Sequence, residues 1–169
     1  DQSMNARISK VDDQGNKTLV FDEPSFNNLF VYQIQSFWKQ GDEYFAITQF
    51  INSVLQHSIG LMILNSDFEI LEIKNTWNIR GQFVNYETKD KIWNPHLNRF
   101  EWIFAIRNDR GLLINEILRL YMDNNTLVIN SLIDNFDTSG FFHALINETT
   151  QDYIINSGND IVIIDSDFS

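Results

Sequence analysis

The chain contains three histidines, the side chains that most often transfer protons or bind transition metals near neutral pH. They are His57, His96 and His143, and they lie far apart in the sequence without a His-Glu-x-x-His or His-x-His spacing. The chain has no Cys, which removes disulfides, thiolate ligands and thiol nucleophiles together. We therefore expect no metal site and no cofactor, and interpret the histidines as surface or internally hydrogen-bonded residues.

Carboxylates suggest two further kinds of site. Oxygen ligands for Ca²⁺ occur in two short runs, 134–137 and 165–167, but neither has the order of an EF-hand loop. Glycoside hydrolysis needs two acids held across a cleft, a separation that a sequence does not fix. The acids considered for it are Glu43, Glu69, Glu72, Glu101 and Glu116. Since the chain has 23 acidic residues, a coincidental pair of acids is expected, and we interpret the runs 134–137 and 165–167 as solvated turn carboxylates.

Motifs for nucleotide binding and acyl transfer are missing from the sequence. The seven glycines are scattered and form neither GxGxxG nor GxxxxGK[ST], and no GxSxG elbow surrounds a serine. We therefore predict that the chain is not an enzyme. A glycan-active enzyme stays as an alternative, on the acids above.

The aromatic residues suggest binding rather than catalysis. Of the four tryptophans, Trp77 and Trp93 lie in the polar stretch 74–98, where burial is least assured. An aromatic face with amide and carboxyl groups around it suits a protein or a glycan. We predict a binding site that includes Trp77, Tyr86, Trp93 and Asn94, with core packing as the alternative for each tryptophan.

Composition and charge narrow the class of protein. With 43% hydrophobic and 14% aromatic residues we expect a globular chain. Its 12 basic and 23 acidic residues give a net charge of −11, which argues against nucleic acid and anionic membrane as partners. The sequence contains no run of about 18 apolar residues, so we predict no membrane insertion. A chain that begins at Asp1 fits a processed or excised polypeptide, and residues 1–20 lack a signal-peptide pattern.

The elements that would position any site are β-strands, and the clearest are in the stretch 99–134. Three runs of apolar and aromatic residues are separated by turn residues at 108–111 and 123–125, which predicts an antiparallel meander. In the first run Trp102, Phe104 and Ile106 alternate with Ile103 and Ala105, so we expect both faces to be covered. We interpret this meander as scaffold.

Hairpins are predicted on both sides of the meander. The alternation around 12–16 predicts one, the runs 29–48 favour a second across 39–42, and 59–73 predicts a third across 65–67. The apolar spacing from Phe26 to Phe37 also fits a helix, so helix and strand both stay open for 26–58. The spacing of apolar residues in 49–58 looks more helical.

The later segments have weaker patterns. We expect 74–98 to be a loop or short hairpin and 134–140 a loop, leave 141–156 as either a helix or a pair of strands, and expect 160–168 to be a strand. Residues 54–68 and 154–168 also match without a gap at an offset of 100 residues, which suggests a repeat.

Two architectures fit these patterns. The favoured one is a single all-β domain over 1–169, with antiparallel hairpins stacked as a sandwich, barrel or propeller-like fold. In the other, a helix before IGLMILNSDFEIL and the three-stranded meander make residues 45–136 resemble a PAS-type sensor domain. That resemblance implies a small-molecule or signal-sensing function, with an N-terminal hairpin region 1–42, a PAS-like core 43–136 and a linker and second repeat 137–169.

From these observations we expect a non-catalytic interaction or structural module that binds a protein or glycan. The exposed edges of its hairpins can add strands from a partner, and we expect a homo- or hetero-oligomer. A surface, secreted or virion-type assembly is the favoured setting.

Overall fold

The computed structural model describes residues 6–22, 25–79, 91–107, 114–138, 142–157 and 160–165. All regular structure in these ranges is antiparallel β-sheet, without a helix, so the predicted all-β fold is confirmed. The PAS-like alternative is wrong, because the helix that it required at 49–58 is absent from residues that are described. The chain divides into two compact units, Asp1–Ile79 and Arg80–Ser169. The single-domain assignment stays a prediction.

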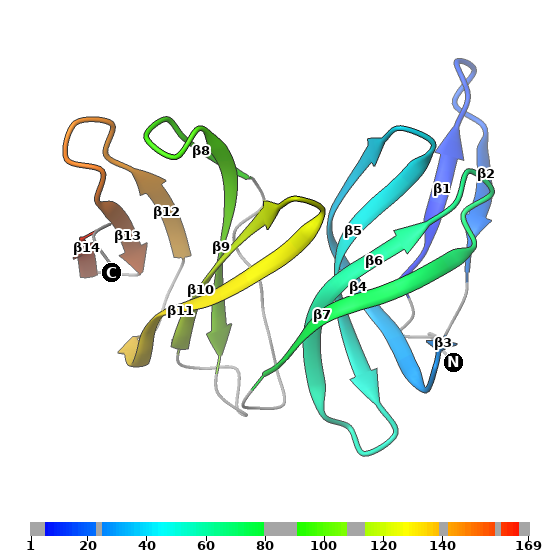
Figure 1. The fold of residues 1–169 in the computed structure, drawn as a ribbon. Helices are drawn as coiled ribbons and strands as arrows, with labels where there is room; N and C mark the ends of the chain where they lie inside the picture. Colours follow the sequence, from blue (N-terminus) through cyan, green and yellow to red (C-terminus); the bar gives the residue numbers. More distant parts are fainter. Residues whose placement is uncertain are drawn as a thin grey trace. The chain divides into compact units, whose positions relative to one another are not determined.

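Unit 1 (Asp1–Ile79) holds a curled five-stranded sheet and a separate hairpin (Figure 1). The sheet has the order β3-β4-β5-β6-β7, in which β3 is Ser25–Phe26, β4 Leu29–Gln40, β5 Glu43–Asn52, β6 His57–Leu64 and β7 Ile70–Asn78. The hairpin pairs β1, Ile8–Val11, with β2, Lys17–Phe21. These strands confirm the hairpins predicted around 12–16, 39–42 and 65–67.

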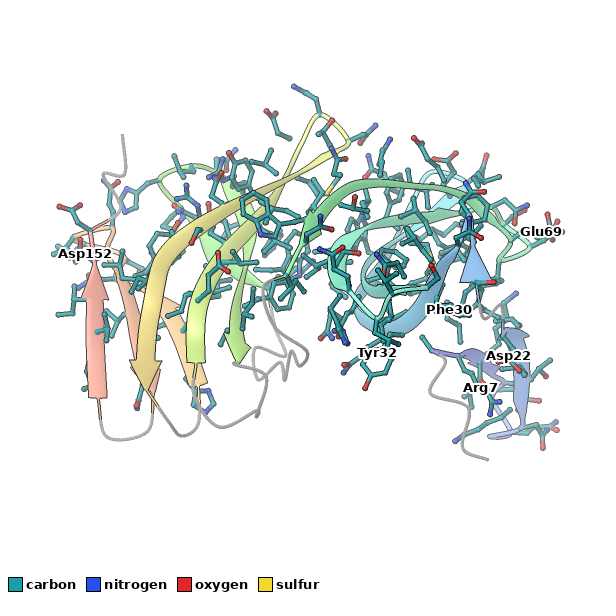
Figure 2. All side chains as sticks on the ribbon, turned by 90° about the horizontal axis from the view of Figure 1, so that it is seen from below. Arg7, Asp22, Phe30, Tyr32, Glu69 and Asp152 are labelled. Atoms are coloured by element: carbon teal, nitrogen blue, oxygen red, sulfur yellow. The ribbon has the colours of Figure 1, made fainter. Side chains whose placement is uncertain are left out.

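The core of unit 1 forms on one face of the curled sheet. Its buried members alternate along the strands, as the period of two requires. They are Phe21, Val31, Ala46, Phe50, Met62, Leu64, Phe68 and Ile70. Phe21 belongs to the hairpin, so its burial attaches β2 to this core. The hairpin is also held together by Arg7, whose Nε donates to Asp22 Oδ1 at 3.1 Å (Figure 2).

The prediction of a helical 49–58 is wrong, and the reason is the turn chemistry of Asn52. Its Oδ1 accepts hydrogen bonds from the backbone N–H groups of Val54, at 3.0 Å, and Gln56, at 2.9 Å. This arrangement closes a tight turn between β5 and β6. Val54 and Leu55, whose spacing indicated a helix, are exposed in that turn.

Unit 2 (Arg80–Ser169) contains two sheets (Figure 1). The first has the order β11-β10-β9-β8, in which β8 is Ile92–Asn94, β9 Arg99–Arg107, β10 Ile114–Asp123 and β11 Thr126–Thr138. The second has the order β12-β13-β14, with β12 Phe142–Ile146, β13 Tyr153–Ser157 and β14 Asp160–Ile164. The predicted meander and C-terminal strand are confirmed, and 141–156 supplies a pair of strands.

Two boundaries in the sequence-based prediction are wrong. Strand β7 continues to Asn78, so the stretch 74–98 begins as strand, whereas β8 pairs with β9 across the turn 95–98 and supplies the short hairpin that was the other expectation there. Strand β11 continues to Thr138, so the loop predicted from residue 134 is strand over most of its length. In both places long pairing partners, β6 and β10, extend the ladder through polar residues. The turn predicted at 108–111 lies outside the described residues.

The two sheets of unit 2 share one core, as the two layers of a sandwich do. The core takes side chains from six strands, three in each sheet. They are Ile103, Ala105, Ile117, Leu132, Ile146, Tyr153, Ile155 and Ile164, packed with partly buried neighbours. On β9 the alternate residues Trp102, Phe104 and Ile106 are buried as well. The prediction that both faces of this strand are covered is confirmed.

Candidate functional site

The residues predicted to form a binding site are distributed over both units. Trp77 lies on β7 of unit 1, where it pairs with Ile59. Trp93 and Asn94 lie on β8 of unit 2, and Tyr86 is outside the described residues. The candidate site described below is therefore built on unit 2 alone.

Neighbouring residues of β8 point to opposite faces of their sheet. Trp93 is 45% exposed, whereas Asn94 is buried. This difference follows from the alternation of side chains along a strand. The short strand thus connects an exposed aromatic surface to a buried polar cluster.

The buried polar cluster is organised around Glu101 on β9, whose side chain is fully buried. Its Oε1 accepts from Arg99 Nε at 2.8 Å and lies 2.7 Å from Arg99 Nη2, a forked ion pair. Its Oε2 accepts from the Asn94 amide at 3.3 Å and from the Tyr153 hydroxyl at 2.5 Å. Both carboxylate oxygens therefore have partners, as a buried charge requires.

Two arginines and two tyrosines complete this cluster. Arg119 on β10 donates from Nη1 to the Tyr153 hydroxyl at 3.1 Å, while its Nε is buried without a hydrogen-bond partner among the described residues. The guanidinium carbon of Arg99 lies 3.4 Å from the centre of the Tyr121 ring, in cation–π contact. The cluster thus holds two guanidinium groups against one carboxylate.

The electrostatics of the cluster favour a structural role. Burial, and then the hydrogen bond to Glu101, raise the pKa of Tyr153 above its ordinary value. This tyrosine stays protonated at neutral pH and donates permanently to Glu101. A general acid or base needs a pKa near the working pH and a path to substrate. Tyr153, fully buried, has neither.

The exposed aromatic surface consists of Trp93 and Phe100, a cross-strand pair between β8 and β9. Their rings meet edge to face, with centroids 4.9 Å apart and planes at 63°. Phe100 is 43% exposed, and the Lys91 ammonium lies 4.2 Å from the centre of its ring. We call Lys91, Trp93 and Phe100 the aromatic surface.

Asn94 connects the strand that carries Trp93 to the buried polar cluster around Glu101. Its Oδ1 accepts from the backbone N–H groups of His96 and Leu97, each at 3.1 Å, which closes the turn between β8 and β9. Its amide binds Glu101. The register that places Trp93 opposite Phe100 is therefore fixed by the buried side chain of Asn94 on the other face of the strand pair.

Sequence analysis identified Trp93 and Asn94 but missed Phe100, Lys91 and Tyr153. The alternation of 92–94 was a usable signal for which side chain faces outward. Phe100 lies opposite Trp93 because of the turn at 94–99, and Asn-Pro-His-Leu-Asn contains the turn residues that indicate one. Tyr153 is 52 residues from Glu101, and no local pattern connects them.

The histidines behave as interpreted from the sequence. His57 is buried, and its Nδ1 accepts from Gln49 Nε2 at 2.6 Å. Burial lowers its pKa. His96 Nε2 lies 2.9 Å from the backbone oxygen of Glu148, and His143 is exposed. Among the described residues no group of three or more His, Asp or Glu side chains is placed to hold a metal ion.

In the same part of the chain, no helix is long and apolar enough to cross a lipid bilayer. Comparisons with protein-family models, with curated protein sequences and with solved structures found no match to this chain.

Proposed function

We propose that this chain is a non-catalytic binding module that contacts a protein partner through the aromatic surface of unit 2. The observation that carries the proposal is that Trp93 and Phe100 are exposed beside each other on two paired strands. The buried side chain of Asn94 fixes the register of these strands. Tryptophan is the residue most enriched among those that dominate protein–protein binding energy. A preorganised aromatic pair loses little side-chain entropy when it binds.

The composition of this surface favours a protein over other ligands. Lys91 provides a cation beside the rings, and Leu97 in the adjoining turn is exposed. Apolar anchors with a charged rim are typical of protein interfaces. The polar groups nearby, those of Asn94 and Glu101, are engaged inside the sandwich.

The test compares binding by the wild-type chain with that of Trp93→Ala and Phe100→Ala variants. The chain is immobilised, and a protein that it retains is purified. The Kd between that protein and the chain is then measured for the wild type and for each variant. We expect each substitution to weaken binding by at least about tenfold, which corresponds to ~1.4 kcal/mol. The matched control is Phe30→Ala, an exposed aromatic on β4 of unit 1, which should bind as the wild type does. Equal Kd values for Trp93→Ala and the wild type would contradict the proposal.

A glycan partner is the second candidate, because the exposed Trp93 ring can stack on a sugar. A panel of purified oligosaccharides titrated into the protein, with Trp fluorescence as the signal, separates the two. A saturable change that Trp93→Ala removes, without any protein partner, would favour the glycan.

A further inference from the structure

The three-stranded sheet of unit 2 has an apolar outer face, opposite to the core. Ile161 and Ile163 on β14 are 69% and 65% exposed, and Leu145 on β12 is 52% exposed. Ile163 pairs with Ile154, which pairs with Leu145, so these three side chains form a row across the sheet. Aliphatic side chains exposed in a row on a sheet indicate a surface that another chain covers.

Strand β14 is also an edge strand in the described part of unit 2. Among the described strands it pairs with β13 alone. An edge strand directs alternate N–H and C=O groups away from its neighbour, where they can pair with another strand. Natural edges are usually protected by Lys, Pro or a β-bulge. The sequence of β14, DIVII, has neither residue, and its ladder to β13 has no register shift.

Charge identifies the chemistry of the occupant. Arg119 is the last basic residue of the sequence, so residues 120–169 contain no Lys or Arg. The same segment contains eight acids, which are Asp123, Asp134, Asp137, Glu148, Asp152, Asp160, Asp165 and Asp167. Tyr153 pairs with Ile164 at one end of the β13–β14 ladder. Asp152 comes directly before β13 and Asp165 directly after β14, so both lie at this end. Asp152 is labelled there in Figure 2.

We propose that β14 accepts an added β-strand from a partner protein, an extended segment with apolar residues at alternate positions and Lys or Arg at its ends. The apolar residues extend the row of Leu145, Ile154 and Ile163, and the two basic ends lie beside Asp160 and Asp165 at the two ends of β14. A second copy of this chain is disfavoured as the occupant, because it would bring another segment with eight acids and no base against the first.

This inference rests on the proposed function only in that both make the chain a protein-binding module. The two surfaces are distinct in sequence. Trp93 and Phe100 lie on β8 and β9, whereas Ile161 and Ile163 lie on β14. Substitutions at one surface therefore test it without altering the other.

The experiment uses the whole chain and a capped probe peptide, Lys-Val-Thr-Val-Thr-Val-Lys, titrated at low ionic strength. Binding is followed through the backbone amide signals in NMR spectra. Two control peptides separate the causes. Glu-Val-Thr-Val-Thr-Val-Glu keeps the apolar residues and reverses the charge, and Lys-Ser-Thr-Ser-Thr-Ser-Lys keeps the charge and removes the apolar residues. We expect the probe to shift the amide signals of β14, and each control to bind at least about tenfold more weakly.

Two variants of the protein complete the test. Ile161→Lys and Ile163→Lys place a charge on the exposed face, where the fold tolerates it, and should each weaken probe binding by at least about tenfold. Leu71→Lys is the matched control, because Leu71 is an exposed residue of β7, the edge strand of unit 1. It should bind the probe as the wild type does, and so should Trp93→Ala. Thermal unfolding of each variant establishes that it is folded.

Several outcomes would overturn the proposal. They are the absence of probe binding, equal binding of Lys-Ser-Thr-Ser-Thr-Ser-Lys, or unchanged binding by both Ile→Lys variants. A dimer of the wild-type chain in light scattering that Ile163→Lys abolishes would assign the edge to a second copy instead. Failure of any kind at β14 leaves the result for Trp93→Ala and its partner unaffected.

Discussion

The hydroxyl of Tyr153 donates a 2.5 Å hydrogen bond to Oε2 of Glu101, joining β13 in one sheet of unit 2 to β9 in the other. The ring of Tyr153 belongs to the apolar core between the sheets, and its hydroxyl belongs to the buried polar cluster. A single side chain therefore marks the boundary between the two. Because hydrogen bonds are directional and core packing is less so, this contact fixes how the sheets are aligned.

Replacing Tyr153 by Phe should destabilise unit 2 without disturbing its packing. The variant keeps the ring but leaves Glu101 Oε2 with one donor fewer and Arg119 without its acceptor. We expect a loss of about 1–3 kcal/mol in the free energy of unfolding, measured by urea denaturation. Tyr121→Phe is the control, since the Tyr121 ring is held by Arg99 and should lose less than about 0.5 kcal/mol. Equal losses in the two variants would refute a special role for Tyr153.

Replacing Glu101 by Gln should be more costly. The change removes the carboxylate that pairs with Arg99 and leaves the guanidinium groups of Arg99 and Arg119 in the cluster without its negative charge. We expect a loss of about 3 kcal/mol in the free energy of unfolding, since breaking a buried ion pair leaves a charge uncompensated. Glu69→Gln, at an exposed turn, provides the comparison. A loss below about 1 kcal/mol for Glu101→Gln would mean that the cluster is dispensable.

The sequence allowed the strands to be predicted better than the site. Alternation is a local property, so Trp102, Ile103 and Phe104 could be assigned to a strand covered on both faces. The same alternation holds in β8 for Trp93 and Asn94. The contact of Tyr153 with Glu101 depends instead on how two sheets pack, which no short window of sequence contains. Glu101 was considered from the sequence only as one of five acids for glycoside hydrolysis, and its burial was not predicted for this reason.

The failure at 49–58 has a local cause and gives a further prediction. Apolar spacing indicated a helix there, but the Asn52 side chain accepts hydrogen bonds from two backbone N–H groups and closes a hairpin. Asn52→Ala should lose about 1–2 kcal/mol of unfolding free energy, because both donors lose their acceptor in the turn. Asn52→Asp keeps the accepting oxygen and should lose much less. If the two variants were equally stable, the turn would not depend on this side chain.

Acid should destabilise unit 1 through His57. Burial lowers the pKa of His57 in the folded chain below the unfolded value, so the unfolded chain binds a proton more readily. The contribution of neutral His57 to stability is therefore complete above about pH 6.5, the usual histidine value, and is lost as the pH falls through the lowered pKa. Urea denaturation at pH values from about 7.5 to about 5 should show stability falling with acid.

The same measurement on His57→Gln identifies the group responsible. Glutamine can keep a hydrogen bond to Gln49, which donates to His57 Nδ1 in the wild type, but it does not titrate. The part of the pH dependence that comes from His57 should therefore disappear in this variant, while its stability at neutral pH falls only modestly. His143→Gln, a change at an exposed histidine, should keep the wild-type profile. A pH profile unchanged by His57→Gln would assign the acid sensitivity to carboxylates, whose protonation destabilises many folded chains at lower pH.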